Sequence, residues 1–247
     1  MVLFEKRIQL AMNGLLQFWI NDYFTDLILT LTLIVVFVLS ITKGKKHPQF
    51  KYFPLYFLSF LVLQFFNYSY FIPAADSALR NTIARMGYYI DWIVTIIEYF
   101  AFTYFFFSIN NNSLKRKVIK WSFIIVTLLA SLFVLNDVLT KSKLSYNSIS
   151  ATYVLESLSL ILFCYLYFHE LFTKFQKTNL LQDTNFWTVT GLTFYSICTL
   201  PTTLVLNYYI TIDYLFYAKI FTIIHVFYLL LFVLIIKSFS CKTPKLI

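Results

Sequence analysis

Long apolar runs separated by short polar connectors dominate the sequence. A helix needs about 20 mostly apolar residues to cross a membrane. Seven runs reach this length, at 22–42, 51–72, 87–108, 118–137, 149–171, 184–206 and 210–236. The connectors carry turn and charge signals, as in KGKKHP at 43–48 and NNNSLKRK at 110–117. The pattern predicts an all-α integral membrane protein built as a seven-transmembrane-helix bundle.

The two ends of the chain differ from these runs. Residues 3–19 place apolar side chains at helical spacing, namely Phe4, Ile8, Ala11, Leu15 and Phe18. This spacing predicts an amphipathic helix that lies at the membrane interface. Residues 1–20 also lack the pattern of a cleavable signal peptide. We therefore expect an interfacial segment over 1–20, a transmembrane domain over 21–240 and a tail over 241–247.

Composition and charge support a membrane protein. Hydrophobic residues make up 60% of the 247 positions and charged residues only 13%, whereas a soluble domain carries about 25% charged residues. The net charge of +9 does not indicate a nucleic-acid partner, because the positive residues lie in short connectors. Thirteen of the twenty Lys and Arg fall on one side of the predicted bundle and six on the other. By the positive-inside rule, the N-terminus lies outside and the C-terminus in the cytoplasm of a multi-pass cell-membrane protein.

Five ionisable residues within the predicted spans are candidates for a site: Asp91, Glu98, Glu156, Lys219 and His225. Charges in a bilayer are costly, so such residues usually face the bundle interior and mark functional sites. Asp91 and Glu98 are seven residues apart, which places them on one helix face. An acidic face can hold Lys219 charged, either as a structural ion pair or as part of a site. An amine in an apolar, aromatic interior can also form a Schiff base with a carbonyl ligand.

Other chemistries lack their motifs. The three histidines fall on different segments without HExxH spacing, and neither a Gly-rich phosphate loop nor a GxSxG turn is present. We therefore expect no metal site and no enzymatic activity.

The third span reads Tyr89-Ile90-Asp91-Trp92-Ile93-Val94-Thr95 and resembles the third helix of microbial rhodopsins, especially proteorhodopsins. The seventh span reads Ala218-Lys219-Ile220-Phe221 and resembles the retinal-binding segment of that family. The resemblance implies all-trans retinal bound to Lys219 as a protonated Schiff base, with Asp91 as counterion. It further implies that Thr95 hydrogen-bonds Asp91 and that Trp92, Trp187 and Phe194 line the retinal pocket. In the sixth span either Trp187 or Pro201 can be aligned with the family pattern.

The sequence departs from that family at three positions. Tyr88 stands where an arginine usually precedes the counterion, Phe102 replaces the proton-donor carboxylate, and Leu215 replaces the second carboxylate near the lysine. The pattern partly resembles xenorhodopsins. The candidate proton relay consists of Glu98, Glu156 and His225.

These observations predict a retinal-binding, light-responsive membrane protein that transports ions, with the proton as the expected ion. A photosensory rhodopsin and a light-gated channel are alternatives within the same family. From other classes, a non-photoactive seven-helix receptor or accessory subunit and a small-solute transporter stay open. The expected partners are the lipid bilayer and retinal, and a homo-oligomer is open.

Overall fold

A computed structural model describes residues 25–69, 77–141, 146–173, 180–209 and 214–241. The long helices are an N-terminal helix (Thr25–Thr42), α2 (Phe53–Ser69), α3 (Ser77–Ile109), α4 (Ser113–Lys141), α5 (Tyr146–Thr173), α6 (Thr184–Tyr209) and α7 (Tyr214–Phe239). Short 3₁₀ turns occur at Gly44–Lys46, Pro48–Phe50 and Leu180–Gln182. Within the described ranges the chain has no β-strand. The predicted all-α class is confirmed.

Five stretches of the described helices are long and apolar enough to cross a membrane, at Thr25–Thr42, Tyr89–Ile109, Ser113–Thr140, Ile149–Thr173 and Thr222–Phe239. The protein is therefore a multi-pass membrane protein. The other two predicted spans correspond to α2 and α6. The described part of α2 has 17 residues, and α6 is rich in threonine and contains Pro201. Seven membrane crossings, like the predicted orientation, stay a prediction.

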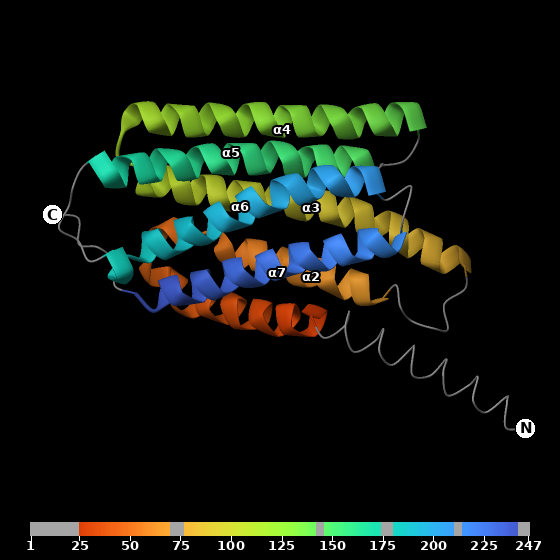
Figure 1. The fold of residues 1–247 in the computed structure, drawn as a ribbon, viewed down its shortest axis with the longest axis horizontal. Helices are drawn as coiled ribbons and strands as arrows, with labels where there is room; N and C mark the ends of the chain where they lie inside the picture. Colours follow the sequence, from red (N-terminus) through yellow and green to blue (C-terminus); the bar gives the residue numbers. More distant parts are fainter. Residues whose placement is uncertain (1–24, 70–76, 142–145, 174–179, 210–213, 242–247) are drawn as a thin grey trace, which may run out of the picture.

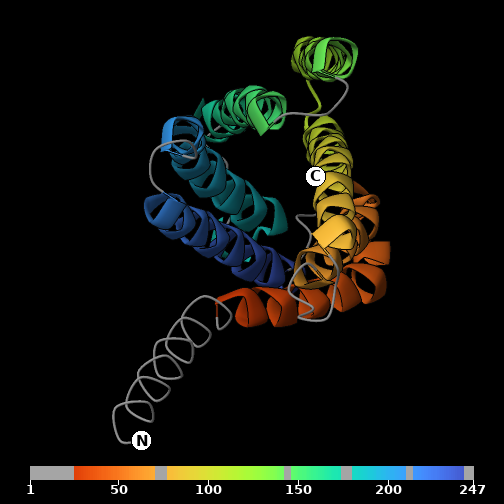
Figure 2. The ribbon, with the colours of Figure 1, turned by 90° about the vertical axis from the view of Figure 1, so that its right-hand side faces the viewer.

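The helices run side by side along the long axis of one bundle (Figures 1 and 2). α6 packs against both α5 and α7, and α2 packs against α3. α4 lies at the outer edge of the end-on view in Figure 2, where its main neighbours are α5 and α3. The predicted interfacial helix at 1–20 and most of the predicted tail lie outside the described residues.

Aromatic side chains fill the interior between α2, α3 and α7. The ring centroids of Phe53 and Phe102 are 5.7 Å apart, and those of Phe57 and Phe232 are also 5.7 Å apart, both in edge-to-face geometry. This arrangement is favourable for aromatic pairs because the positive ring edge meets the negative ring face. The core therefore joins helices that are distant in sequence, and it surrounds the few polar side chains of the interior.

Candidate functional site

Asp91 lies on α3 and is held by a tyrosine from α5. The Tyr153 hydroxyl donates a hydrogen bond of 2.8 Å to Asp91 Oδ1. Thr95, the predicted partner of this carboxylate, instead donates its hydroxyl to the main-chain carbonyl oxygen of Asp91, also at 2.8 Å. A threonine in a helix commonly bonds to the carbonyl four residues earlier, and this bond uses its one donor. Tyr153 therefore holds the Asp91 carboxylate in this structure, and the role of Thr95 beside a retinal counterion stays a prediction.

Glu98 lies two turns further along α3 and ends a chain of tyrosines. The Tyr228 hydroxyl of α7 donates to Glu98 Oε2 at 3.2 Å, and the Tyr195 hydroxyl of α6 donates to Tyr228 at 2.7 Å. The rings of Tyr195 and Tyr228 also pack together, with centroids 4.7 Å apart. Only 1% of Glu98 is exposed. A carboxyl group from α3 is thus connected by hydrogen bonds through α7 to α6, entirely within the bundle.

Glu156 contributes a second buried carboxyl group from α5, and only 1% of it is exposed. It lies close enough to Glu98 for the two charges to interact. Neither carboxyl oxygen of Glu156 has a hydrogen-bond partner among the described residues. One position further along α5, the hydroxyls of Ser157 and Thr199 are 3.5 Å apart and connect α5 to α6. The prediction that Glu98 and Glu156 face the interior is confirmed.

His225, the third predicted relay residue, is paired with an acid that the sequence reading did not select. Its Nδ1 is 2.7 Å from Asp26 Oδ1 of the N-terminal helix. Asp26 lies near the start of the predicted run 22–42, a position typical of a residue at the membrane surface rather than of an interior group. The structure shows that this helix lies against the middle of α7 at Asp26. His225 is also three residues from Tyr228, which places the two side chains on neighbouring positions of one α7 face.

The backbone of Lys219 lies near the level of Asp91, although its side chain is outside the described set. α3 and α7 run in the same direction (Figure 1) and meet at the bond between Glu98 and Tyr228. Asp91 is seven residues before Glu98, or about 10 Å along the axis, and Lys219 is nine before Tyr228, or about 13 Å. The two positions thus differ by about 3 Å in height. Trp92, beside Asp91, has a buried indole N–H without a partner among the described residues.

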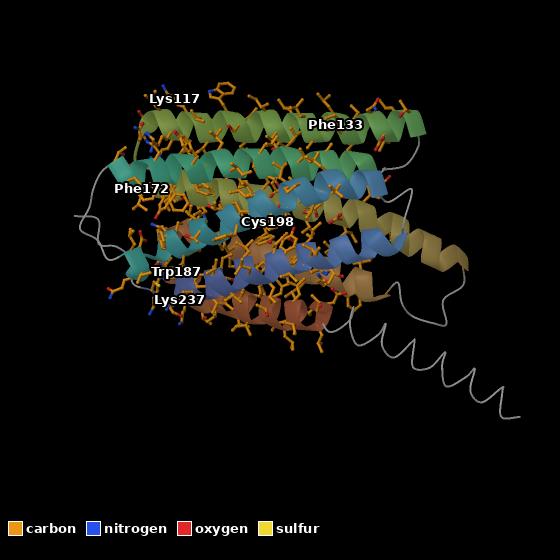
Figure 3. The ribbon with its side chains drawn as sticks, in the orientation of Figure 1. Lys117, Phe133, Phe172, Trp187, Cys198 and Lys237 are labelled. Carbon is orange, nitrogen blue, oxygen red and sulfur yellow. The ribbon has the colours of Figure 1, made fainter. Side chains whose placement is uncertain are left out.

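Trp187 lies far from this level, at the opposite end of α6. Its indole N–H donates to the main-chain oxygen of Leu181 at 2.9 Å, and the Lys237 ammonium is 6.0 Å from its ring. Figure 3 shows Trp187 and Lys237 at the same end of the bundle as Lys117 and Phe172, with Cys198 nearer the middle of α6. The Cys164 thiol of α5 is 3.9 Å from the main-chain oxygen of Val189 on α6, so these two residues lie at one level. Tyr153 is about 16 Å from Cys164 along α5, and Trp187 lies on the far side of Val189 from it. The structure does not bring Trp187 to Asp91.

Phe194 is 52% exposed, so its side chain points out of the bundle rather than toward Asp91. On α6, Pro201 lies near the level of Asp91 and Tyr153. It comes two residues after Thr199, whose hydroxyl touches that of Ser157, and Ser157 is one turn from Tyr153. A retinal held by Lys219 would therefore meet the Pro201 region of α6. Asp91, Trp92 and the height of Lys219 fit such a group, and the predicted pocket residues Trp187 and Phe194 do not.

Tyrosines are the site residues that the sequence did not indicate: Tyr153, Tyr195 and Tyr228. With 19 tyrosines in the chain, the residue type alone does not select these three. Helical spacing could have selected two of them, because Tyr153 and Glu156 are three residues apart, as are Tyr228 and His225. Each pair therefore shares a helix face.

The polar residues around the start of α6 form a separate group with a structural role. Asp183 Oδ1 accepts the main-chain N–H of Asn185 at 2.8 Å and caps the helix. Its Oδ2 accepts the Tyr167 hydroxyl at 3.4 Å, and the Gln49 amide donates to Asn185 Oδ1 at 3.3 Å. Burial raises the pKa of the Asp183 carboxyl above its usual value. These contacts fasten the 3₁₀ turn before α2 to the start of α6.

The comparisons with known proteins supply no family for this chain. No family model matches it, and neither a curated protein nor a solved structure matches it. The resemblance to microbial rhodopsins stays a prediction that rests on the residues of the third and seventh spans.

Proposed function

We propose that this multi-pass membrane protein transfers protons through the interior of its helix bundle. The observation that carries the proposal is the buried chain from Tyr195 through Tyr228 to Glu98, with hydrogen bonds of 2.7 and 3.2 Å. Carboxyl and phenol oxygens can each give up and accept a proton, and groups within hydrogen-bond reach of one another can exchange it. Charged or polar groups in a bilayer are costly and commonly form proton relays.

The residues divide into three proton-holding groups. Asp91 with Tyr153 lies about two turns before Glu98 on α3, Glu98 and Glu156 are the buried carboxyl groups of α3 and α5, and His225 with Asp26 lies between α7 and the N-terminal helix. Together they come from four helices, namely the N-terminal helix, α3, α5 and α7. The proposed arrangement in the membrane has seven spans, the N-terminus outside and the C-terminus in the cytoplasm, as the distribution of Lys and Arg predicts.

Retinal on Lys219 is the second candidate and would make the transfer light-driven. The similar heights of Asp91 and Lys219 favour it, because a carboxylate beside the amine stabilises the positive charge that a retinal-binding lysine carries. When bound, retinal would supply light absorption and a change of shape. Asp91 would hold the opposite charge, Tyr153 would fix the orientation of its carboxylate, and Trp92 would pack at the same level. Within this candidate, a photosensory protein and a light-gated channel are the alternatives to a pump.

The proton-transfer proposal is tested by flux measurements in liposomes that contain the purified protein and a pH-sensitive dye. A potassium diffusion potential drives protons inward, and a protonophore gives the maximum signal. Wild-type protein should pass protons faster than empty liposomes, and Glu98→Gln should reduce this flux by about 100-fold, the usual scale for loss of a proton-transferring group. Glu170→Gln, the same change at the end of α5, should retain the flux. Equal flux in wild type and Glu98→Gln would refute the relay.

The retinal candidate has its own test. Wild-type protein and Lys219→Ala are expressed with all-trans retinal, purified, and compared by visible absorption. A band in wild type that is lost in Lys219→Ala supports the candidate. If folded wild-type protein lacks this band, the retinal candidate is excluded, and a proton relay that works in the dark remains. Folded protein with neither the band nor proton flux would favour the receptor or accessory-subunit alternative.

A further inference from the structure

The first turns of α4 carry more positive charge than the neighbouring side chains compensate. Four of the first eight residues of this helix are basic, namely Lys115, Arg116, Lys117 and Lys120. The Lys115 ammonium forms an ion pair of 2.8 Å with Glu170 Oε2 of α5. Neither Arg116, Lys117 nor Lys120 forms an ion pair with a described residue. Three positive charges of this group are therefore left without a counter-charge in the described part of the chain.

These three cations are neighbours on the helix surface. Arg116 and Lys120 are four residues apart, and Lys117 and Lys120 are three apart, so their side chains share one side of α4. Arg116 Nε donates to the main-chain oxygen of Asn110 at 2.6 Å, and its guanidinium carbon is 5.1 Å from the centroid of the Phe107 ring of α3. Lys117 and Lys120 are exposed, and Figure 3 shows Lys117 at the outer edge of the bundle. The group is therefore open to a partner from outside the protein.

An aromatic and then an apolar surface continue from these cations along α4. Trp121 is 61% exposed and comes four residues after Lys117, so the two side chains lie on one helix face. Tryptophan favours the level where the polar headgroups of a membrane meet its apolar layer. Ile125, Leu128 and Leu132 follow on the same face and are also exposed. The distance from Trp121 to Leu132 is about 16 Å along the axis, close to the depth of one leaflet of a hydrocarbon layer about 30 Å thick.

This order of surfaces matches the parts of a phospholipid. A phosphate is negative, the glycerol and ester groups lie at the interface, and the acyl chains fill the apolar layer. A soluble anion would use the cations and leave the apolar surface unused, and a zwitterionic lipid has no net charge to balance three cations. Basic residues that only set the orientation of a helix act through the side of the membrane on which they lie, and they need no shared face. Charge complementarity therefore favours a phospholipid with a net negative charge.

We propose that the start of α4 binds an anionic phospholipid, with its phosphate between the ammonium groups of Lys117 and Lys120. Arg116 contributes a third positive charge beside the headgroup. Trp121 packs against the glycerol and ester region, and one acyl chain lies along the exposed apolar side chains that follow it. The proposal concerns the outer surface of the bundle and does not depend on proton transfer through its interior.

The test uses the full-length protein in nanodiscs of phosphatidylcholine that contain increasing amounts of a lipid with brominated acyl chains. Bromine quenches tryptophan fluorescence at short range, and the difference between wild type and Trp121→Phe isolates the signal of Trp121. Wild type should be quenched at lower amounts of brominated phosphatidylglycerol than of brominated phosphatidylcholine. Lys117→Gln/Lys120→Gln should lower this preference by about tenfold, because each basic residue near an anionic surface strengthens binding by up to about fivefold.

Two matched pairs of substitutions separate a site from a general attraction. Lys117→Arg/Lys120→Arg retains both charges and should retain the preference for the anionic lipid. Lys43→Gln/Lys46→Gln removes two exposed positive charges from the connector before α2 and should leave the preference at Trp121 unchanged. Lys117→Gln alone is a milder variant in case the double variant does not fold, and it should lower the preference by up to about fivefold.

Equal quenching of wild type by the two brominated lipids would overturn the proposal. An unchanged preference in Lys117→Gln and in the double variant Lys117→Gln/Lys120→Gln would overturn it as well. If Lys43→Gln/Lys46→Gln loses as much preference as Lys117→Gln/Lys120→Gln, the basic residues attract anionic lipid only as a whole, and the site at α4 is wrong.

Discussion

α3 and α4 are consecutive helices, each long and apolar enough to cross a membrane, yet they occupy different environments. α3 carries Asp91 and Glu98 toward the interior and buries Phe102, Phe105 and Phe106. α4 lies at the edge of the bundle and exposes large apolar side chains along its length, among them Leu114, Leu128, Leu132 and Leu139. Apolar composition therefore predicts that a helix crosses the membrane. The position of its ionisable residues predicts whether it lines the interior.

The charges of α4 support this distinction. Its basic residues lie near the two ends of the helix, where long basic side chains can reach the polar membrane surface. Its one acid, Asp137, lies near the end of the helix and is 2% exposed. The Lys115 ammonium is 2.8 Å from Glu170 Oε2 at the end of α5 and also donates to the main-chain oxygen of Leu166. This pair joins the start of α4 to the end of α5. The acids of α3, in contrast, are in the middle of the bundle and are held by phenol groups.

The largest effect should come from a charge on the outer face of α4. Leu128 is 59% exposed near the middle of the helix, so Leu128→Lys would place an amine among lipid tails at a cost of about 2.5–3.5 kcal/mol. The yield of folded protein in the membrane should fall sharply, measured by size-exclusion chromatography of a fluorescent fusion. Leu114→Lys is the matched control, because this residue lies in the first turn near Lys115 and Lys117. Equal yields would contradict a lipid-facing α4.

The next effect concerns the contact between α6 and α7. A Cβ atom added at Gly191 would lie 3.2 Å from side-chain atoms of both Leu231 and Leu234. Gly191→Leu should therefore force the helices apart and lower the free energy of unfolding by about 1–3 kcal/mol. At Gly87 of α3 a Cβ atom would meet nothing within 4 Å. Gly87→Leu should be at least as stable as wild type, and unfolding in detergent–denaturant mixtures measures both.

The fold and the site were predictable to different degrees. Run length and connectors were enough to place the helices, since the predicted run 118–137 lies within α4 and 184–206 lies within α6. The helical period placed Asp91 and Glu98 on one side of α3. Neither property determines how far a helix is rotated about its axis relative to its neighbours. The resemblance to microbial rhodopsins assigned Trp187 and Phe194 to the pocket, and only the packing of α6 against α5 and α7 shows where they point.

The hydrogen-bond partners were the least predictable part. Tyr195 and Tyr228 lie on α6 and α7, more than 90 residues from Glu98. Their meeting depends on the tertiary packing of three helices. Asp26 was missed for a related reason, because its contact with His225 depends on how the N-terminal helix packs against α7. A single sequence carries no direct signal for this contact.

A moderate effect is expected at the Asp91 carboxylate. Tyr153→Phe removes the hydroxyl that donates to Asp91 Oδ1 and leaves that oxygen without this donor, at a cost of about 1–3 kcal/mol. Tyr165→Phe is the control, because Tyr165 is 61% exposed on the outer face of α5. Thermal unfolding in lipid nanodiscs should separate the two variants. Equal stability would show that the bond does not hold α3 to α5.

The smallest effect concerns His47, which lies between the N-terminal helix and α2, outside the spans. Burial, aided by the charge of Lys46, lowers the pKa of this histidine below its usual 6.5. The folded state therefore favours the neutral ring, and its stabilising effect is present above pH 6.5 and is lost as the pH falls below it. Unfolding at a series of pH values should show this slope in wild type and a flatter one in His47→Gln. A slope of the opposite sign would contradict the assignment.

The most direct test of the central claim follows the protonation of Glu98 itself. Infrared difference spectra of the protein in lipid, recorded between two pH values, report the carbonyl stretch of carboxyl groups that gain or lose a proton. The proton-relay account predicts that Glu98→Gln removes one of these bands and that Glu170→Gln leaves the same band in place. A spectrum in which Glu98→Gln retains every carboxyl band of the wild type would show that Glu98 does not exchange protons, and it would contradict the account.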